Sequence, residues 1–338
     1  MSKNSGKVYA KRPFTFCKMS LFTSLRYLVA LHQHKHFGRA ADACHITQPA
    51  LSNAIRTLED EYGTTIVKRG RNFECFTPEG ERILASALRV LREQEVLKQE
   101  IQSSLTHPVG RLILCAVPTV VPVAARFVGH LQRRYEGIAI VLRSMSSPEI
   151  EAGLENLSID LALGYTQRMK PRVVEIKAVD QYREQYFLLR KSRKHNRGGL
   201  RITQESMAWK DAAALPLCLL TPEMHNRTIV DSAFKEAGVS VRPIIETNSI
   251  LTLGLSVMVG DVYSVLPSAM VGVLRGYGEL EAVPLVAPEV VTPIGFMFAH
   301  TARPTQALRV ALELAKDPEW AAHLALHTGP LTELRSRA

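Results

Sequence analysis

The spacing of apolar residues changes near Gly110, and this change constrains the fold more than any other feature of the sequence. Before it, apolar residues recur every three or four positions, as they do in amphipathic helices. After it, short β-rich runs alternate with helical stretches, which predicts an α/β domain with parallel strands. The predicted strands cover residues 112–117, 139–143, 161–165, 186–190, 217–220, 243–247, 262–266, 282–286 and 294–299.

The helical part contains a pattern typical of a helix-turn-helix. A first helix is predicted from Phe22 to His34, and Gly38 can cap a short second helix. Thr47 is a good N-cap for a third helix that runs to about Tyr62 and is closed by the following glycine. Residues 64–77 combine apolar residues with a basic tip, which predicts a two-stranded wing.

A long helix is predicted to begin after Thr77, because a cap, a proline and an early acid follow one another there. Its apolar residues recur with the spacing of a coiled-coil seam, and such a stripe needs a partner. The sequence therefore predicts a homodimer through this helix, which associates further into a homotetramer. The seam consists of Ile83, Ala87, Val90, Gln94, Leu97 and Ile101.

These patterns, together with the family resemblance given below, predict four consecutive parts of the chain. Residues 1–18 form an N-terminal extension without regular structure. Residues 19–77 form the DNA-binding domain, residues 78–107 the linker and dimerisation helix, and residues 108–338 the regulatory domain. Within the regulatory domain, subdomain I is expected at about 110–183 and 287–320, and subdomain II at about 184–286.

The charge distribution favours nucleic acid as a partner of the N-terminal part. The net charge is +10, and residues 1–77 hold 12 basic against 5 acidic residues. A small basic module joined to a nearly balanced domain is typical of a nucleic-acid reader attached to a part that does not touch nucleic acid. Double-stranded DNA and a small-molecule effector are the predicted partners.

Two other classes of protein compete with this interpretation. A solute-binding protein of a transport system would share the fold of the regulatory half, but the missing signal peptide and the basic front quarter count against it. An enzyme is disfavoured because the chain holds no G-x-S-x-G, no G-x-x-x-x-G-K-[ST] and no complete G-x-G-x-x-G motif. No run is apolar enough to span a membrane, so a cytoplasmic protein is expected.

No cofactor or metal is expected. The five cysteines are an odd number at wide spacings without a C-x-x-C pair, which disfavours both disulfides and zinc. His32 and His36 are four residues apart, but no carboxylate or cysteine nearby completes a metal site, so they are interpreted as surface histidines.

An ordered block of motifs resembles the LysR-type transcriptional regulators, and the resemblance extends over the chain from Met19 onwards. The resemblance also includes the end of the wing, the linker helix and Arg111-Leu112, which opens the regulatory domain. The resemblance implies an α/β regulatory domain of two subdomains, similar to periplasmic binding proteins, preceded by an all-α winged helix-turn-helix domain and a long linker helix. The block consists of Phe37-Gly38-Arg39-Ala40-Ala41 and Thr47-Gln48-Pro49-Ala50-Leu51-Ser52-Asn53-Ala54-Ile55-Arg56-Thr57-Leu58-Glu59.

Shorter runs in the regulatory domain are similar to the branch that contains the cyanate-responsive regulator. This second resemblance implies a small anionic effector. Three positions depart from the family pattern: His36 stands where a serine is common, Cys44 where leucine is usual, and Cys75 where a basic wing residue is frequent. The runs include Met145-Ser146, Asp160-Leu161-Ala162-Leu163-Gly164, Leu220-Thr221-Pro222-Glu223 with Arg227, and Ile245-Glu246-Thr247-Asn248-Ser249-Ile250.

The third helix carries the residues expected to read DNA. Gln48 and Ser52 lie one turn apart, where Gln can pair with adenine and Ser with either class of base, and Arg56 continues that face. The N–H groups at the helix start, capped by Thr47, are expected to face phosphate. The full set of predicted DNA-binding residues is Arg39, Thr47, Gln48, Pro49, Ser52, Asn53, Arg56, Arg69 and Arg71, of which Arg39, Arg69 and Arg71 are phosphate contacts.

Polar residues that follow predicted strands are the candidates for effector binding. Thr119 and Val120 begin a helix after the first strand, and Asn248 and Ser249 repeat that arrangement on the other subdomain. Because strand ends of both subdomains face one cleft, an anion between them is predicted. The full set is Thr119, Val120, Ser146, Tyr165, Thr221, Arg227, Asn248 and Ser249.

Overall fold

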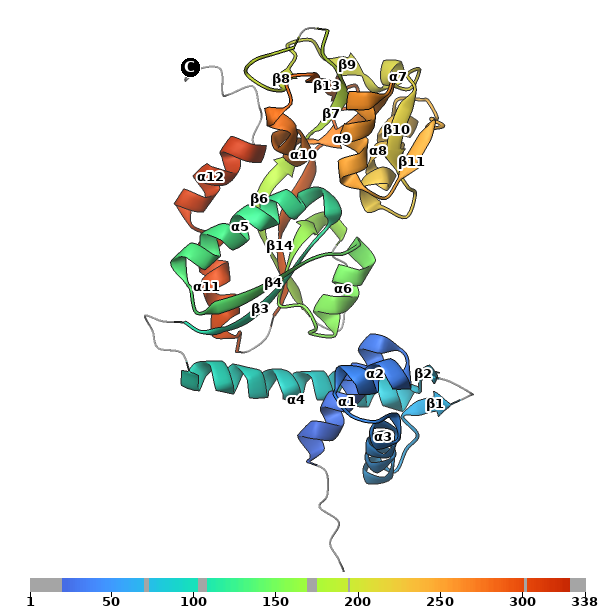
Figure 1. The fold of residues 1–338 in the computed structure, drawn as a ribbon, viewed down its shortest axis with the longest axis vertical. Coiled ribbons are helices and arrows are strands. Elements are labelled where there is room, and N and C mark those ends of the chain that lie inside the picture. The colour runs from blue at the N-terminus through green and yellow to red at the C-terminus, as the bar shows by residue number, and fades with distance from the viewer. Residues whose placement is uncertain are drawn as a thin grey trace, which may run out of the picture. The chain divides into compact units, whose positions relative to one another are not determined.

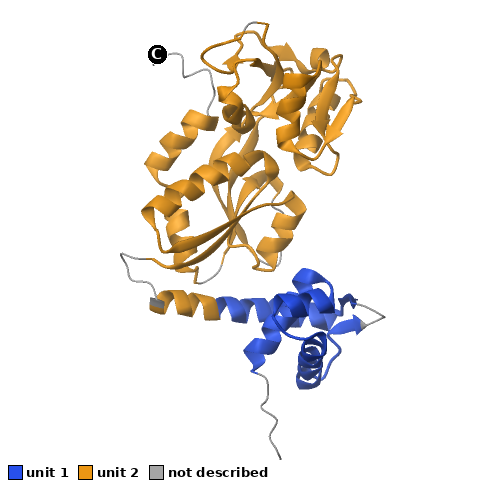
Figure 2. Ribbon diagram, in the orientation of Figure 1, with its two compact units in different colours: residues 1–93 blue, residues 94–338 orange. Residues whose placement is uncertain are grey.

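A computed structural model describes residues 20–69, 73–102, 108–168, 175–193, 195–300 and 303–328. The chain divides into two compact units, residues 1–93 and 94–338 (Figures 1 and 2). Within the described ranges, no helix is both long and apolar enough to cross a membrane.

The first unit is a helical module with a wing. The three predicted helices are confirmed, and Gly63, with φ of 63°, ends the third in the left-handed region that glycine adopts without strain. Leu28, Leu51 and Ile55 are fully buried where the three helices meet. The elements are α1 (Leu21–His34), α2 (Phe37–Ala43), α3 (Gln48–Tyr62), β1 (Val67–Arg69), β2 (Phe73–Phe76) and α4 (Pro78–Gln102), which continues past residue 93 into the second unit.

The second helix begins two residues earlier than a Gly38 cap would place it. His36 is the N-cap, and its Nδ1 accepts a hydrogen bond of 3.2 Å from the Arg39 N–H. The residue that departs from the family pattern therefore still performs the capping that a serine would. Because α1 ends at His34 and His36 caps α2, the spacing of His32 and His36 does not place both on one helix.

The wing is confirmed as an antiparallel pair of strands, β1 and β2, so the domain is not all-α. It is tied to α3 by Glu59, whose Oε1 accepts the backbone N–H groups of Ile66 and Val67 at 2.9 and 3.2 Å. Thr77 then caps α4 as predicted, since its Oγ1 accepts from the Gly80 N–H at 2.9 Å. These bonds fix where the wing leaves the helices.

The predicted seam of α4 divides into two sets of residues. Ala87 is buried in the core of the first unit, and Ile83 is half-buried against it. Val90, Leu97 and Ile101 are 41%, 57% and 76% exposed. Only the second half of the predicted stripe is therefore available to a partner.

Subdomain I of the second unit is built on a five-stranded sheet with the order β4-β3-β5-β14-β6. β3, β4 and β5 are parallel, and β14 runs antiparallel to both β5 and β6. Phe127 and Trp320 are buried together against this sheet. The elements are β3 (Gly110–Ala116), η1 (Pro118–Val120), α5 (Val121–Arg134), β4 (Ile138–Ser144), α6 (Ser147–Glu155), β5 (Leu161–Tyr165), η2 (Thr166–Arg168), β6 (Ile176–Glu184), β14 (Thr292–Ala299), α11 (Gln306–Leu314) and α12 (Pro318–Thr328).

Subdomain II is built on a seven-stranded sheet with the order β11-β10-β12-β7-β13-β8, and β9 pairs with β13. Trp209 and Phe234 are buried on one face of the sheet, and Leu253 and Val257 on the other. The elements are β7 (Tyr186–Lys191), β8 (Arg201–Ile202), β9 (Met207–Ala208), α7 (Trp209–Ala212), β10 (Leu217–Leu220), α8 (His225–Glu236), β11 (Ile245–Thr247), α9 (Ile250–Val259), β12 (Tyr263–Pro267), α10 (Ser268–Val273), η3 (Leu274–Gly276) and β13 (Leu280–Val286).

The nine predicted strands are confirmed, but the expectation of parallel sheets is wrong for part of each sheet. β7 pairs antiparallel with both β12 and β13, because the chain enters subdomain II on β7 and leaves it on β13. The chain thus crosses between the subdomains twice, at residues 184–186 and 286–292. The long edge strand β6 and the short strands β8 and β9 were not predicted.

Candidate DNA-reading helix and effector cleft

Helix α3 presents the predicted DNA-reading residues to solvent. Its apolar side is buried in the helical core, while Gln48, Asn53 and Arg56 are exposed and Ser52 is half-buried. Gln48, Ser52 and Arg56 are spaced by four residues, so they follow one another along the same side. The helix thus offers a polar, basic face, as a helix that enters the major groove does.

The start of α3 has the predicted cap. Thr47 Oγ1 accepts the Ala50 N–H at 3.4 Å, and the exposed Pro49 occupies the first turn. On α2, Arg39 is also exposed. Arg69 ends β1, and its side chain and the whole of Arg71 lie outside the described residues.

A chain of polar groups crosses the cleft between the subdomains. Thr119 Oγ1 and Tyr165 Oη, both from subdomain I, are 3.1 Å apart. Asn226 Nδ2, from the first turn of α8 in subdomain II, donates to Tyr165 Oη and to Tyr186 Oη at 3.4 Å each. Burial raises the pKa of Tyr165 to about 12, so its hydroxyl carries its proton at neutral pH.

These groups line a small cavity. Its walls come from Thr119, Ser147 and Tyr165 on one side and from Met224, His225 and Asn226 on the other. The space open to the centre of a water molecule is about 10 Å³, which is room for about one water. Any larger ligand therefore requires the cleft to widen.

Two features of this cavity favour a negatively charged ligand. The Ser147 Oγ is buried and has no hydrogen-bond partner among the described residues. The 12-residue helix α8 begins at the cavity, and Met224 at its N-cap offers no side-chain cap. The first N–H groups of a helix have no intrahelical acceptor, and its dipole favours an anion at that end.

A cation and a histidine lie beside the cavity. Arg168 Nε donates to Glu151 Oε1 at 2.7 Å, and its Nη1 is 3.2 Å from His225 Nδ1. Burial, followed by the charge of Arg168, lowers the pKa of His225, so its imidazole is neutral at pH 7. The His225 ring also contacts the Tyr165 ring, with centroids 4.8 Å apart.

Among the other predicted effector residues, Ser146 also lines the cavity, and its Oγ donates to Glu149 as part of a capping box. Val120 is fully buried. Arg227 donates to Asp231 Oδ1, Glu246 Oε1 and the Leu220 carbonyl at 2.6 to 2.7 Å, so it braces α8 against β10 and β11. Thr221, Asn248 and Ser249 do not line the cavity, and Ser249 caps α9 by accepting the Thr252 N–H.

Sequence analysis missed four residues that the structure brings to the cavity. Ser147, His225 and Asn226 line the cavity, and Arg168 lies beside it. Ser147, Arg168 and His225 each lie within three residues of a strand end or a helix start, which is the signal that singled out Thr119 and Tyr165. Ser147 directly follows the predicted Ser146, and Asn226 directly precedes the predicted Arg227.

Both cysteines of the second unit are buried. Cys115 lies in β3 and Cys218 in β10, and both have no exposed surface. Burial raises the pKa of Cys115 to about 11 and also raises the pKa of Cys218. Both thiols are therefore protonated at neutral pH and out of reach of a reagent in solvent.

Comparisons with known proteins agree with this architecture. Residues 22–81 match the family described as bacterial regulatory helix-turn-helix protein, lysR family, and residues 106–318 match LysR substrate binding domain. The DNA-binding transcriptional dual regulator OxyR of Escherichia coli is 28% identical over 298 residues, which cover 86% of this chain and 91% of OxyR. A hydrogen peroxide-inducible genes activator of Pectobacterium carotovorum is 34% identical over 158 residues, covering 46% of this chain and 52% of that protein.

Two solved structures share the fold. Full-length OxyR from Pseudomonas aeruginosa, with one cysteine replaced, has a TM-score of 0.66 and 23% identity, covering 91% of this chain and 98% of that one. Full-length CbnR in complex with its target DNA has a TM-score of 0.56 and 20% identity, covering 87% and 98%. The two family matches together span most of the chain, from the DNA-reading helix to the effector cleft, so the chain belongs to the LysR family of DNA-binding transcriptional regulators.

Proposed function

We propose that the protein binds its operator through α3 and that a small anion, bound in the cleft between Thr119 and Asn226, controls this binding. The observation that carries the proposal is the cavity itself. It joins donors from both subdomains, and the buried Ser147 hydroxyl has no partner among the described residues. An anion that satisfies these donors changes the separation of the subdomains, because the cavity holds about one water when the cleft is closed.

The proposed effector is bound reversibly and does not oxidise a cysteine. Several relatives are named hydrogen peroxide-inducible genes activators, which raises peroxide as a candidate signal. Reaction with peroxide requires an accessible thiolate. Residues 108–338 contain only Cys115 and Cys218, and burial in strands with raised pKa values makes both poor candidates.

The finer relationship to the cyanate-responsive branch stays a prediction. The relatives reported above are OxyR-type regulators, so the anionic effector rests on the cavity and not on that branch. The helix start of α8, the hydroxyl of Ser147 and the nearby Arg168 support it. Cytoplasmic location likewise remains an expectation, in keeping with a partner that is chromosomal DNA.

The homodimer and homotetramer remain our prediction, but fewer residues of α4 are expected to form the dimer contact. Val90, Leu97 and Ile101 are apolar and exposed on α4, whereas Ala87 is used by the core of its own unit. Pairing two copies of α4 through the exposed residues would remove them from water. We therefore propose a homodimer through this part of α4, and a homotetramer built from two such dimers.

The DNA-reading role of Gln48 is testable with a single substitution. Gln48→Ala should weaken binding to the operator by about 1–3 kcal/mol and leave binding to a scrambled duplex nearly unchanged, because the amide reads a base and not the backbone. Gel-shift titrations on both duplexes measure this. Thr57→Ala, a change on the exposed side of the same helix, is the control. Equal losses on both duplexes for Gln48→Ala would remove the base-reading role.

The cleft is tested by a change that keeps its shape. Thr119→Val removes the hydroxyl next to Tyr165 and should weaken binding of the effector by roughly 0.5–3 kcal/mol, with operator affinity in the absence of effector little changed. A thermal-shift screen of the full chain with small inorganic anions and carboxylates selects the ligand, and calorimetry then compares the variants. Thr228→Val, at an exposed position of α8, is the control. Unchanged affinity in Thr119→Val would place the effector elsewhere.

A further inference from the structure

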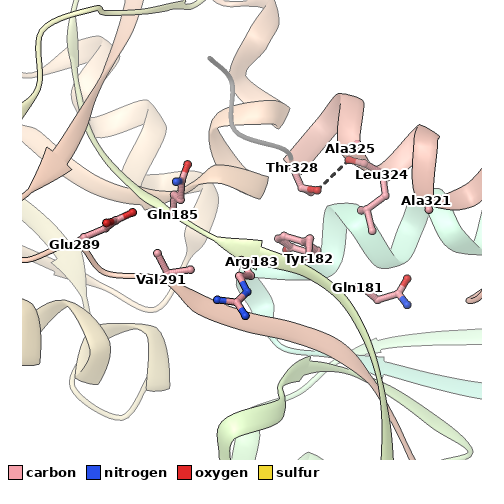
Figure 3. Close-up of a pocket in the computed structure, with 10 residues that line it drawn as sticks. All are labelled: Gln181, Tyr182, Arg183, Gln185, Glu289, Val291, Ala321, Leu324, Ala325 and Thr328. Carbon is pink, nitrogen blue, oxygen red and sulfur yellow. Dashed lines mark hydrogen bonds between the residues drawn. The ribbon is translucent and has the colours of Figure 1, made fainter. Parts of the chain in front are cut away.

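A second and much larger cavity lies at the two chain crossings between the subdomains. Its volume is about 430 Å³, within the range of small-molecule sites. One wall comes from the end of β6 and the residue after it, a second from the segment that leads into β14, and a third from α12 (Figure 3). The lining residues are Gln181, Tyr182, Arg183, Gln185, Glu289, Val291, Ala321, Leu324, Ala325 and Thr328.

The floor of this cavity is connected by hydrogen bonds. Tyr182 Oη donates to Glu184 Oε2 at 2.9 Å, and the fully buried Glu184 also accepts from Ser268 Oγ and from the Ala269 N–H. Gln181 is held by Trp320, whose Nε1 donates to Gln181 Oε1 at 2.7 Å. These bonds connect β6 to α10 of subdomain II and to α12, so the shape of the cavity is set by elements of both subdomains.

The charged residues of the cavity are available to a ligand. Arg183 and Glu289 carry opposite charges, come from different crossings, and lie on either side of Val291 in Figure 3. No ion pair joins them, and within the described part of the chain neither side chain has a hydrogen-bond partner. Two opposite charges that face one cavity without pairing are complementary to a zwitterion.

The remaining wall is apolar. Val291, Leu324 and the methyl groups of Ala321 and Ala325 lie beside the charged pair, and the Gln185 side chain adds a neutral amide. A ligand that fits this lining has a carboxylate for Arg183, an ammonium group for Glu289 and an apolar side chain. Arg binds carboxylates through two parallel hydrogen bonds, which fixes the orientation of the ligand.

We propose that this cavity at the crossings binds an α-amino acid with an apolar side chain, as a second regulatory ligand separate from the cleft. Because the ligand would touch both crossings and α12, its affinity depends on the angle between the subdomains. Binding there therefore shifts the same opening that the cleft ligand shifts. The proposal does not rest on the identity of the cleft effector.

Calorimetry with the full chain tests the proposal, with L-leucine, L-methionine and L-phenylalanine as probes. At least one should bind, and N-acetyl-L-leucine and L-leucinamide should each bind at least about tenfold more weakly than L-leucine, because each lacks one of the two charges. Arg183→Gln and Glu289→Gln should each weaken binding by about tenfold or more, and both side chains are on the surface, so the variants should fold. Arg242→Gln, an exposed arginine away from the cavity, should bind as the parent does.

Four results would overturn the proposal. The first is no binding of any of the three amino acids up to about 10 mM, which is beyond the weakest affinity of interest. The second is equal binding of L-leucine and N-acetyl-L-leucine, which would remove the role of Glu289. The third is binding that is lost in Thr119→Val and kept in Arg183→Gln, which would assign the amino acid to the cleft. The fourth is binding only by a chain that ends at Thr328, which would show that residues 329–338 fill the cavity.

Discussion

Replacing Val90 and Leu97 together by aspartate is expected to produce monomers whose operator affinity falls by about 100-fold or more. The two side chains are 41% and 57% exposed on α4, so the substitutions do not disturb the core of either unit. Charges in a helix-helix seam oppose pairing, and a monomer contacts one half-site where a dimer contacts two. Sedimentation and gel-shift titration measure the two effects.

A charge-matched variant separates pairing from electrostatics. Ala85→Asp combined with Lys98→Gln changes the net charge by the same amount at exposed positions of α4 and leaves the apolar residues in place. It should remain dimeric and lose only the part of the affinity that depends on net charge. If the Val90 and Leu97 double variant sediments like the parent protein, α4 is not the dimer seam.

Gly80→Ala is expected to destabilise the DNA-binding unit by about 2–4 kcal/mol. A Cβ at Gly80 would lie 2.1 Å from the carbonyl oxygen of Ile66, which is backbone at the base of the wing and cannot rotate away. The strain would fall on the junction where Thr77 Oγ1 accepts the Gly80 N–H and starts α4. Calorimetric unfolding of the full chain should show a lower transition temperature for this unit. Gel-shift titration should show weaker operator binding.

The same substitution in α5 provides the control. A Cβ at the exposed Gly129 meets no atom within 4 Å, and alanine is the better helix former by about 1 kcal/mol. Gly129→Ala should therefore raise the unfolding transition temperature of the second unit and leave operator binding unchanged. A Gly80→Ala variant as stable as the parent would show that the wing and α4 can separate without cost.

Local signals made the helical module predictable. The cap at Thr47, the buried stripe of α3 and the glycine that ends it all lie within 17 consecutive residues of the sequence, from Thr47 to Gly63. Spacing did not reveal which side of α4 faces its own domain, because Ala87 and Val90 repeat with the same period. That distinction depends on how the preceding helices pack.

Contacts between residues far apart in the sequence explain which features of the second unit could not be predicted. The edge strand β6 mixes apolar with charged and polar residues without a regular alternation and pairs with β14, more than 100 positions later, so its own sequence resembles a surface segment. Arg227 follows a strand as a ligand-binding residue would, yet Glu246 on β11 satisfies its guanidinium. Thr119 and Tyr165 are predictable because Thr119 lies three residues after β3 and Tyr165 ends β5 of the same sheet, whereas their partner Asn226 belongs to the other subdomain.

The chain passes between the subdomains twice, at residues 184–186 and 286–292. Two covalent links side by side behave as a pair of hinge pins, which permit rotation about one axis and resist both sliding and pulling apart. Every ligand that acts on the regulatory domain, whatever its chemistry, then acts by changing one angle, the angle between the two subdomains. The effects of several ligands on this domain therefore combine in a single rotation of one subdomain against the other.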